Sequence, residues 1–315
     1  MFRRRAPRHS ADVTVPGARP GRGLSTAGGP RPHEPAPASG PAGRDPGGPP
    51  PPGLDVSTAH PARVWNYWLG GRDYFAADRA AGEQLSREYP HLALAARAER
   101  AFLVRAVRFL AGPARIRQFL DIGAGLPAGG NTHEIAQRIA PDTGIVYADN
   151  DPAVLAHARA LLQNPMLAST PEGAVSYVDA DLRDVTAVLA RSARTLDLSR
   201  PVALIMLGVL GYLDDHGAAR SITSQLMDAL PPGSYLAIAD GVAGTGPVDA
   251  AQQRYNGAAP VPYHLRRPDQ LASFFDGLDL IDPGVVPCPR WKPDAPGPSG
   301  HDAEPPVYCA VARKP

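Results

Sequence analysis

The spacing of apolar residues divides the chain into a tail and two folded segments. Residues 1–55 show no repeated apolar spacing; they are rich in proline, glycine, alanine and arginine and end in "PGGPPPPGLD". A segment of this composition has little surface to bury, so we expect residues 1–55 to form a disordered or extended tail. Order is expected to begin within residues 56–61.

The next segment, residues 56–113, has the apolar spacing of helices. Arg63–Leu69 is predicted to form a short helix with three aromatic residues, ended by two glycines. Asp73 is a suitable N-cap for a second helix over Tyr74–Glu88. Pro90 begins a third helical segment, whose predicted buried face consists of Leu92, Leu94, Phe102, Leu103, Val107 and Leu110. We expect residues 56–113 to form an N-terminal helical cap.

From residue 114 to residue 315, short apolar runs alternate with helical patterns, which predicts an α/β domain built on a parallel sheet. The expected strands are Ile116–Ile122, Gly144–Ala148, Ala174–Val178, Val202–Leu207, Ser234–Ala239, Leu280–Pro287 and Val307–Ala312. The expected helices are Thr132–Ile139, Pro152–Leu162, Val185–Ala190, Ala218–Ala229 and Pro268–Phe275. The stretch between the fifth strand and the last helix is expected to be irregular.

Charge and composition narrow the partners and the compartment. The chain has 32 lysine and arginine residues against 31 aspartate and glutamate residues, so no field of one sign attracts nucleic acid or an anionic membrane. No apolar run approaches the ~20 residues that span a bilayer, and the arginines at positions 3–5 precede no apolar signal segment. Cys288 and Cys309 lack CxxC spacing, which favours free thiols in a reducing cytoplasm over a disulfide or a metal site.

The most informative stretch is a glycine-rich loop, "FLDIGAGLPAGGNT", which follows the first expected strand. A phosphate-binding P-loop is excluded because the loop has no lysine. The dinucleotide pattern GxGxxA is satisfied by residues 123–128, but Asp121 would place a carboxylate against a pyrophosphate. The loop is also long, so the helix begins late, with Asn131 or Thr132 as its N-cap, away from the place where a pyrophosphate would bind.

S-adenosylmethionine suits this loop better, because it carries an ammonium and a sulfonium and has no phosphate. Asp121 can then attract the cationic end, and Gly123 and Gly125 allow the backbone to approach the ligand closely. Asp149, followed by Asn150, ends the second strand and can accept both ribose hydroxyls, a feature that fits a nicotinamide dinucleotide equally well.

The end of the third strand adds a site for the adenine. Within "VDADLRD", either Asp179 or Asp181 can accept a hydrogen bond from the adenine amino group, and Leu182 can pack on the ring. Only one of the two aspartates is needed for this contact, and the sequence leaves the choice open.

Longer motifs carry a more specific resemblance. The segments "HPARVWNYWLGGRDYFAADRAA", "RQFLDIGAGLPAGGNTHEIAQ", "VYADNDPAVLAHARALL" and "DGLDLIDPGVVPCPRW" occur in this order. Together they resemble the bacterial S-adenosyl methyltransferase family once catalogued as a domain of unknown function, over about residues 55–313. The resemblance implies a Rossmann-like class I methyltransferase sheet, mostly parallel with an antiparallel final strand. It also implies an N-terminal helical lid and S-adenosylmethionine as the cofactor.

By the same resemblance, the first motif belongs to the lid. Arg63, Tyr67, Gly70 and Gly71 lie in that motif, where an arginine can pair with the methionine carboxylate and a tyrosine can shield the sulfonium. Trp65 and Trp68 are expected to be packing residues of the cap. Asn131 and Thr132 can cap their helix, contact the cofactor, or do both.

The acceptor is less defined. Where related methyltransferases often have a histidine after the fourth strand, this chain reads "GVLGYLDD", with Gly211 at that position. The remaining catalytic candidates, all weak, are Tyr74, His133, Tyr212, Asp214 and His216. Methyl transfer depends mainly on positioning, and a general base is needed only if the acceptor must lose a proton early.

Three functions follow from these features. The preferred one is methyl transfer to a small-molecule acceptor, because no [D/N/S]-P-P-[Y/F/W] motif follows the fourth strand and no basic stripe suggests nucleic acid. The second is a non-catalytic S-adenosylmethionine-binding or regulatory protein, which Gly211 favours. The third is an NAD-dependent oxidoreductase. The sequence does not indicate an oligomeric state.

Overall fold

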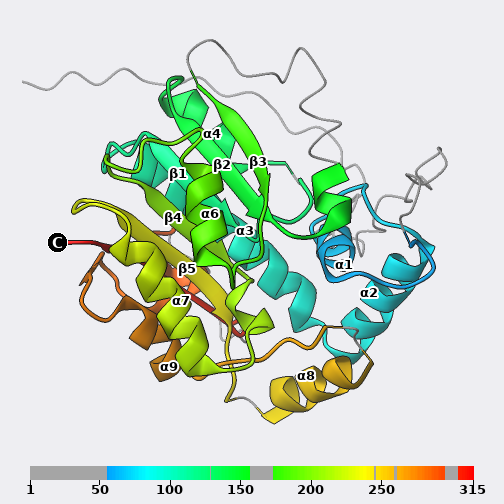
Figure 1. Ribbon diagram of the computed structural model, residues 1–315. Helices are drawn as coiled ribbons and strands as arrows, with labels where there is room; N and C mark the ends of the chain where they lie inside the picture. Colours follow the sequence, from blue (N-terminus) through cyan, green and yellow to red (C-terminus); the bar gives the residue numbers. More distant parts are fainter. Residues whose placement is uncertain (1–54, 128, 157–172, 245, 259–260, 295–303) are drawn as a thin grey trace, which may run out of the picture. The chain divides into compact units, whose positions relative to one another are not determined.

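The computed structural model describes residues 55–127, 129–156, 173–244, 246–258, 261–294 and 304–315 (Figure 1). The tail expected over residues 1–55 therefore lies outside the described residues, apart from Asp55. The described part contains one sheet with the strand order β3-β2-β1-β4-β5-β8-β6, and β7 pairs with β8.

Five parallel strands form the main part of this sheet. They are β1 (Gln118–Ile122), β2 (Gly144–Asp149), β3 (Val175–Asp179), β4 (Ala203–Leu207) and β5 (Tyr235–Gly241). The last strand, β8 (Val307–Arg313), runs antiparallel to β5. The predicted sheet, mostly parallel with an antiparallel final strand, is confirmed.

The strand expected over Leu280–Pro287 was wrong as one element. It consists of two dipeptides, β6 (Asp279–Leu280) and β7 (Val286–Pro287), which pair separately with β8. Gly284 (φ = 82°) lies between them and its N–H donates to the Ile281 carbonyl at 2.9 Å, so a turn interrupts the apolar run.

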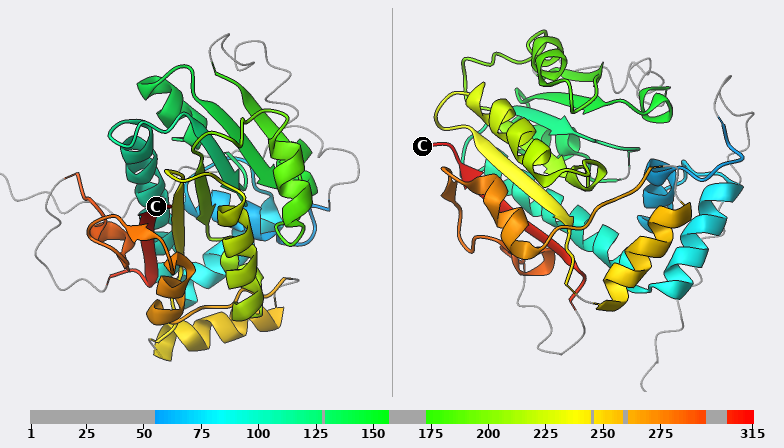
Figure 2. Two further views of the ribbon diagram at one scale, coloured as in Figure 1. Left: turned by 60° about the vertical axis from the view of Figure 1, so that its left-hand side comes forward. Right: turned by 60° about the horizontal axis from the view of Figure 1, so that its bottom comes forward.

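Helices cover both faces of the sheet (Figure 2). The helices α3 (His91–Ala111) and α4 (Thr132–Ile139) pack on one face, where Phe102 and Ile135 share a core with Phe119. The other face is covered by α6 (Val185–Ser192), α7 (His216–Asp228) and α9 (Pro268–Ala272), with a 3₁₀ turn after α9 over Ser273–Phe275. Both faces being covered explains why the strands read as continuous apolar runs.

Of two predicted elements after the second strand, one is helical where it is described and the other was wrong. The helix expected over Pro152–Leu162 is described only through residue 156, which is helical, and its remainder lies outside the described residues. The stretch after β5, expected to be irregular, contains α8 (Gly246–Ala258). Its sequence, "GPVDAAQQRYNGA", has only Val248, Ala251 and Tyr255 at helical spacing, too few large apolar residues to give a clear periodic signal.

The cap consists mainly of α1 (Pro61–Trp68) and α2 (Ala76–Glu88). Val64 and Trp68 form a small core with Ala96, so the first part of α3 joins the cap while the rest of α3 packs on the sheet. The N-cap expected at Asp73 was wrong, because α2 begins at Ala76 and Asp78 accepts from the Phe75 N–H at 2.8 Å. Leu94, expected in the buried face of α3, is 47% exposed.

Candidate functional site

The loop between β1 and α4 requires glycine at two points. Gly123 has φ = 71° and Gly125 has φ = 62°, both in the left-handed region that favours glycine. A Cβ atom added to Gly123 would lie 2.6 Å from Cγ2 of Val209, so the loop after β1 packs directly on the loop after β4. The sheet changes winding direction between these two strands, and ligands of open α/β sheets bind at such a point.

The late start of α4 is confirmed. Asn131 is its N-cap residue and the helix begins at Thr132. Glu134, in the first turn, accepts hydrogen bonds from the Gly130 N–H at 3.0 Å and from Asn131 Nδ2 at 2.7 Å. Arg100 of α3 donates to Asn131 Oδ1 at 2.9 Å. Asn131 therefore links the glycine-rich loop to α3 on one side and to α4 on the other.

Asp121 lies beneath this loop. Its side chain is 7% exposed, and Oδ2 accepts a hydrogen bond from Thr132 Oγ1 at 2.6 Å. Burial raises the pKa of Asp121 to about 6, while the Thr132 hydrogen bond and the charge of Arg100 act in the opposite direction. A cation bound nearby would stabilise the ionised form of this carboxylate.

Asp149, at the end of β2, joins two loops. Its Oδ2 accepts from the Gly125 N–H at 3.0 Å, and its Oδ1 accepts from the Asp151 N–H at 2.9 Å. Burial raises the pKa of Asp149, and these backbone hydrogen bonds lower it. The carboxylate is thus fixed beside the glycine loop, where the sequence predicted it.

The two candidate adenine partners lie next to Asp149 but differ in how they are held. Strand register places Asp179 beside Asp149, and Asp179 is exposed. Asp181 accepts from the Arg183 N–H at 2.8 Å and from Asn150 Nδ2 at 3.3 Å. The predicted Asn150, Asp181 and Asp149 are therefore brought together, and Leu182 is buried in the adjoining core.

The cap contacts the loops that follow β1 and β2. Asn66 of α1 donates through Nδ2 to the Pro127 carbonyl at 3.2 Å, and His60 Nδ1 lies 3.1 Å from Asp151 Oδ2. Gly71 has no room for a side chain, because an added Cβ would overlap Asn66, and Gly70 ends α1 with φ = 75°. The two glycines therefore shape the cap around Asn66, a residue that sequence reasoning did not single out.

Arg63 makes its hydrogen bonds within the cap. Its side chain is 3% exposed, and Nε donates to Asp78 Oδ1 at 3.1 Å. The remaining guanidinium nitrogens donate to the Asp55 carbonyl at 2.9 Å and the Thr58 carbonyl at 2.7 Å. These bonds hold the guanidinium in the interior of the cap, and its expected pairing with a methionine carboxylate stays a prediction.

The aromatic residues of α1 also pack within the cap. Tyr67 meets Tyr74 edge-to-face at 5.1 Å, and a Cβ on Gly82 of α2 would lie 2.6 Å from the Tyr67 ring. Trp68 is buried and donates through Nε1 to the Gly82 carbonyl at 3.2 Å, and Trp65 packs against it. Tyr67 and Tyr74 therefore help to hold α1 on α2. Neither side chain forms a hydrogen bond to the loops after β1 and β2 within the described residues.

A second cluster lies at the ends of β4 and β5. Asp240 is 2% exposed and accepts from the Gly211 N–H at 3.1 Å, from the Gly241 N–H at 3.0 Å and from the Tyr263 hydroxyl. A Cβ on Gly211 would overlap the Tyr263 ring. Burial raises the pKa of Asp240 to about 7, although the charge of Arg266 and the backbone hydrogen bonds lower it.

Glu99 of α3 faces the same edge of the sheet. A Cβ on Gly208, which follows β4 with φ = 62°, would lie 3.0 Å from Glu99 Oε1. The carboxylate is 5% exposed and makes no hydrogen bond within the described residues. Burial raises the pKa of Glu99 well above its ordinary value, and the charge of Asp240 adds to this effect.

Tyr212 packs against the cluster at the ends of β4 and β5. Its ring meets Tyr263 edge-to-face at 5.1 Å. Burial raises the pKa of Tyr212, and so do Tyr255 and the carboxylates of Asp240, Glu99 and Asp149. Tyr212 thus lies in the loop after β4, one residue from Gly211 and packed against Tyr263.

The other candidates have structural surroundings. His133 Nδ1 lies 2.8 Å from the Tyr147 hydroxyl, between α4 and the sheet. His216 Nε2 lies 3.1 Å from Ser273 Oγ on the far side of α7, and Asp214 is exposed at the start of the loop before it. Among the described residues, no group of three or more His, Cys, Asp or Glu side chains could hold a metal ion.

Sequence reasoning missed Glu99, Asp240 and Tyr263. Two of them left a signal: Glu99 is an acidic residue on the buried face of a helix, and Asp240 ends a strand as Asp121 and Asp149 do. Tyr263 left none, because it follows the unpredicted α8.

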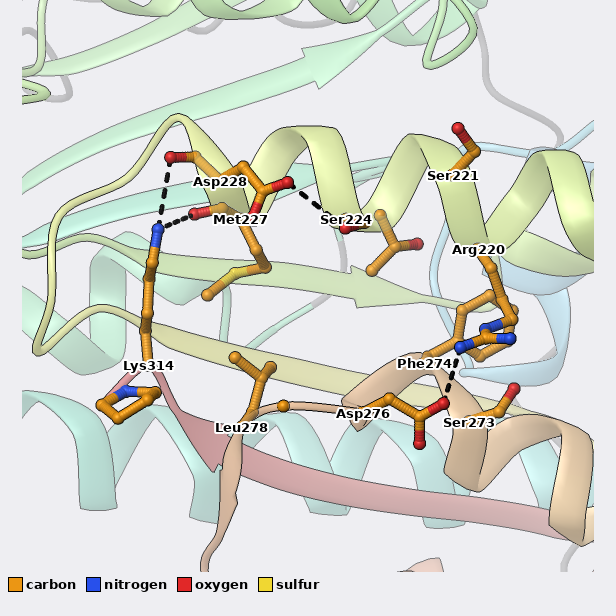
Figure 3. Close-up of a pocket in the computed structure, with 13 residues that line it drawn as sticks. Arg220, Ser221, Ser224, Met227, Asp228, Ser273, Phe274, Asp276, Leu278 and Lys314 are labelled. Atoms are coloured by element: carbon orange, nitrogen blue, oxygen red, sulfur yellow. Dashed lines mark hydrogen bonds and ion pairs between the residues drawn. The ribbon is translucent and has the colours of Figure 1, made fainter.

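A groove of about 460 Å³ lies elsewhere, between α7 and the segment after α9 (Figure 3). Lys314, at the end of β8, donates there to the carbonyls of Met227 at 2.8 Å and Leu230 at 2.6 Å, and Arg220 pairs with Asp276 at 2.6 Å. Its charged groups stabilise helix ends and surface pairs. Because β8 is antiparallel to β5, this groove adjoins the edge where the parallel strands begin, away from both clusters.

Comparison with known proteins identifies the family. The family model described as S-adenosyl methyltransferase matches residues 48–315. A DUF574 family protein from Streptomyces avermitilis is 43% identical, with a TM-score of 0.76 over 83% of this chain and 99% of that one. A putative methyltransferase from Thermobifida fusca is 39% identical, with a TM-score of 0.76 over 84% of this chain and 98% of that one. The chain matches none of the curated proteins compared. It belongs to the S-adenosyl methyltransferase family and is an S-adenosylmethionine-dependent methyltransferase.

Proposed function

We propose that this methyltransferase acts on a small molecule that binds at the carboxyl ends of β4 and β5. The observation that carries the proposal is the group of buried side chains at the loop after β4, where Glu99 approaches Gly208 and Tyr263, held by Asp240, packs on Gly211. Buried carboxylates without a basic surface suit a small polar ligand better than a nucleic acid, which needs cationic contacts.

The residues on the β1–β2 side suit S-adenosylmethionine. This cofactor, when bound, supplies a methyl group activated by a positively charged sulfur. Two carboxylates whose pKa values are raised by burial, those of Asp121 and Asp149, favour a ligand with cationic groups and disfavour a pyrophosphate. We assign Asp149 to the ribose, Asp121 and Thr132 to the methionine end, and Asp181 with Leu182 to the adenine.

The protein's own residues contribute by positioning the acceptor against the methyl group and by excluding water. Two contacts, of Asn66 with Pro127 and of His60 with Asp151, hold the cap against the loops after β1 and β2, to which we assign the cofactor. Closure of this cap would shield the reacting groups from solvent, and its opening would release product.

The two other functions considered from the sequence lose their main supports. Gly211 favoured a non-catalytic protein, but the Tyr263 ring accounts for the glycine on packing grounds. The family match gives no support to an NAD-dependent oxidoreductase. No described helix is long and apolar enough to cross a membrane. Cys288 and Cys309 are buried free thiols, which is consistent with the proposed cytoplasmic location.

The proposal is tested by incubating the protein with S-adenosylmethionine labelled in its methyl group and a bacterial extract separated by molecular mass. We expect label in the low-mass fraction, and its loss with Asp149→Asn but not with Asp142→Asn, an exposed aspartate that pairs with Arg117 at 3.6 Å. Label confined to protein or nucleic acid would exclude a small-molecule acceptor.

A further inference from the structure

Glu99 is a buried carboxylate without a protein partner in the described part of the chain. Burial of an unpaired polar group costs several kcal/mol, and nearly all such groups in proteins are paired. The side chain occurs on the inner face of α3 among Phe102 and Leu103, where an apolar residue would pack without this cost. Its oxygen is directed at Gly208, the residue that follows β4. Glu99 therefore has the features of a group kept for a ligand.

Two tyrosines pack at the loop after β4, and a third, Tyr255, contributes to the raised pKa of Tyr212. Tyr263 is held by Asp240 and meets Tyr212 edge-to-face, while the hydroxyls of Tyr212 and Tyr255 form no hydrogen bond within the described residues. Tyr255 belongs to α8, which lies beside α2 (Figure 2). There Arg254 stacks on the Tyr89 ring at 5.3 Å and reaches Glu88 at 4.0 Å. These contacts join α8 to the cap, and the rings of Tyr212 and Tyr263 adjoin the loop after β4 that the Glu99 carboxylate approaches at Gly208.

The two neighbouring arginines, Arg266 and Arg100, donate hydrogen bonds to other groups. Arg266, which acts on Asp240, donates to the carbonyls of Leu210 at 2.7 Å and Leu213 at 2.6 Å. Arg100, which acts on Glu99, donates to the Gly129 carbonyl and to Asn131. Neither arginine donates a hydrogen bond to Glu99 within the described residues, so a bound cation would stabilise the ionised form of this carboxylate, whereas an anion would not.

We propose that the methyl acceptor is a cationic amine, whose ammonium group binds to Glu99 against the faces of Tyr212, Tyr255 and Tyr263. A carboxylate and aromatic faces together recognise ammonium groups. This inference rests on the proposed small-molecule function and names its substrate class. It places the amine on the β4–β5 side and leaves Asp121 and Asp149 to the cofactor.

Glu99 can also accept the proton that such an acceptor must lose. An ammonium nitrogen has no lone pair and cannot be methylated. When the amine binds, an N–H bond breaks and the proton forms an O–H bond with the Glu99 carboxylate, which leaves the lone pair on nitrogen for attack. A carboxylate with a raised pKa is a better proton acceptor than an exposed one.

The test separates a low-mass bacterial extract by cation exchange at pH 7 and incubates each fraction with protein and methyl-labelled S-adenosylmethionine. We expect label in the retained, cationic fraction. Glu99→Gln should lower that incorporation about 100-fold or more. Glu83→Gln, in an exposed pair with Arg79 on α2, is the matched control and should not change it. If Glu99→Gln does not fold, Tyr212→Leu provides an independent variant: it removes one aromatic face, keeps an apolar side chain, and should lower incorporation into the cationic fraction.

A binding measurement separates the acceptor from the cofactor. S-adenosylhomocysteine retains the methionine ammonium, so its calorimetric affinity for Glu99→Gln should equal that for the unmodified protein. A clear loss of this affinity would assign Glu99 to the cofactor and overturn the inference, as would full transfer by Glu99→Gln. Label only in the neutral and acidic fractions would overturn the amine but leave the small-molecule function intact. Label in no low-mass fraction would refute both.

Discussion

The ring of Tyr263 occupies the space that any side chain at residue 211 would need, and Gly211 in turn donates its N–H to Asp240, the carboxylate that holds the Tyr263 hydroxyl. The glycine is thus part of a packed unit at the end of β4. Its presence follows from Tyr263 rather than from a lost catalytic histidine.

Gly211→Ala should therefore destabilise the protein. The added methyl overlaps the Tyr263 ring, and overpacking of this kind costs about 1–3 kcal/mol. Urea unfolding measures the free energy of unfolding, and the loss should shrink when Tyr263 is also changed to alanine. Gly257→Ala in α8 is the control, since an added Cβ there meets nothing within 4 Å. Equal effects of Gly211→Ala with and without Tyr263 would show that the two residues are not coupled.

Asp149→Ala should weaken S-adenosylhomocysteine binding by ~1–3 kcal/mol, because it removes charge-assisted hydrogen bonds. Part of this loss would come from the Gly125 and Asp151 amides that Asp149 holds. Calorimetry on the folded variant measures the affinity, with Asp142→Ala as the exposed control. An unchanged affinity would refute the assignment of Asp149 to the cofactor.

The two aspartates after β3 can be ranked in the same assay. Asp181 is positioned by Asn150 and Arg183, whereas Asp179 is exposed. We expect Asp181→Ala to lower the affinity for S-adenosylhomocysteine and Asp179→Ala to leave it nearly unchanged. The reverse order would make Asp179 the adenine partner.

The clustering of the residues that we assign to the cofactor was predictable because its information is local. Asp121, Gly123, Gly125 and Asp149 end strands or form the loop directly after them, so strand prediction alone brings them to one edge. The acceptor half depends on packing between distant segments. Glu99 meets Gly208, and Tyr263 meets Gly211, only after α3 and the segment after α8 fold onto the sheet. For Arg63, the motif marked the residue but not its partner. The hydrogen bond to Asp78 forms only when α1 and α2 pack together, which the sequence does not show.

Arg63→Met should loosen the cap. It leaves Asp78 buried and unpaired, and breaking a buried ion pair in this way costs about 3–5 kcal/mol. Hydrogen exchange of residues 60–89 should accelerate markedly. Arg79→Met is the control: its pair with Glu83 is exposed, and such pairs contribute at most about 1 kcal/mol. Unchanged exchange combined with a large loss of S-adenosylhomocysteine affinity would instead support direct contact between Arg63 and the cofactor.

The free energy of unfolding should fall as the pH rises from 5 to 8. Burial raises the pKa of Asp240 to about 7 and that of Asp121 to about 6, above the ordinary value of 3.8. The folded protein therefore binds protons in this range that the unfolded chain has already released. Each such group contributes stability that is fully present below pH 3.8 and is lost as the pH rises through its folded pKa, with a slope of up to about 1.4 kcal/mol per pH unit.

Asp240→Asn isolates one of these groups, because an amide does not titrate. Urea unfolding at pH 5, 6, 7 and 8 should show a smaller decline for this variant than for the unmodified protein, and the difference should concentrate below about pH 7. Asp269→Asn is the control, since its Arg267 partner lowers the pKa of Asp269 and so it titrates below this range. Parallel slopes for Asp240→Asn and the unmodified protein would mean that Asp240 is ionised throughout, and that its three hydrogen bonds outweigh its burial.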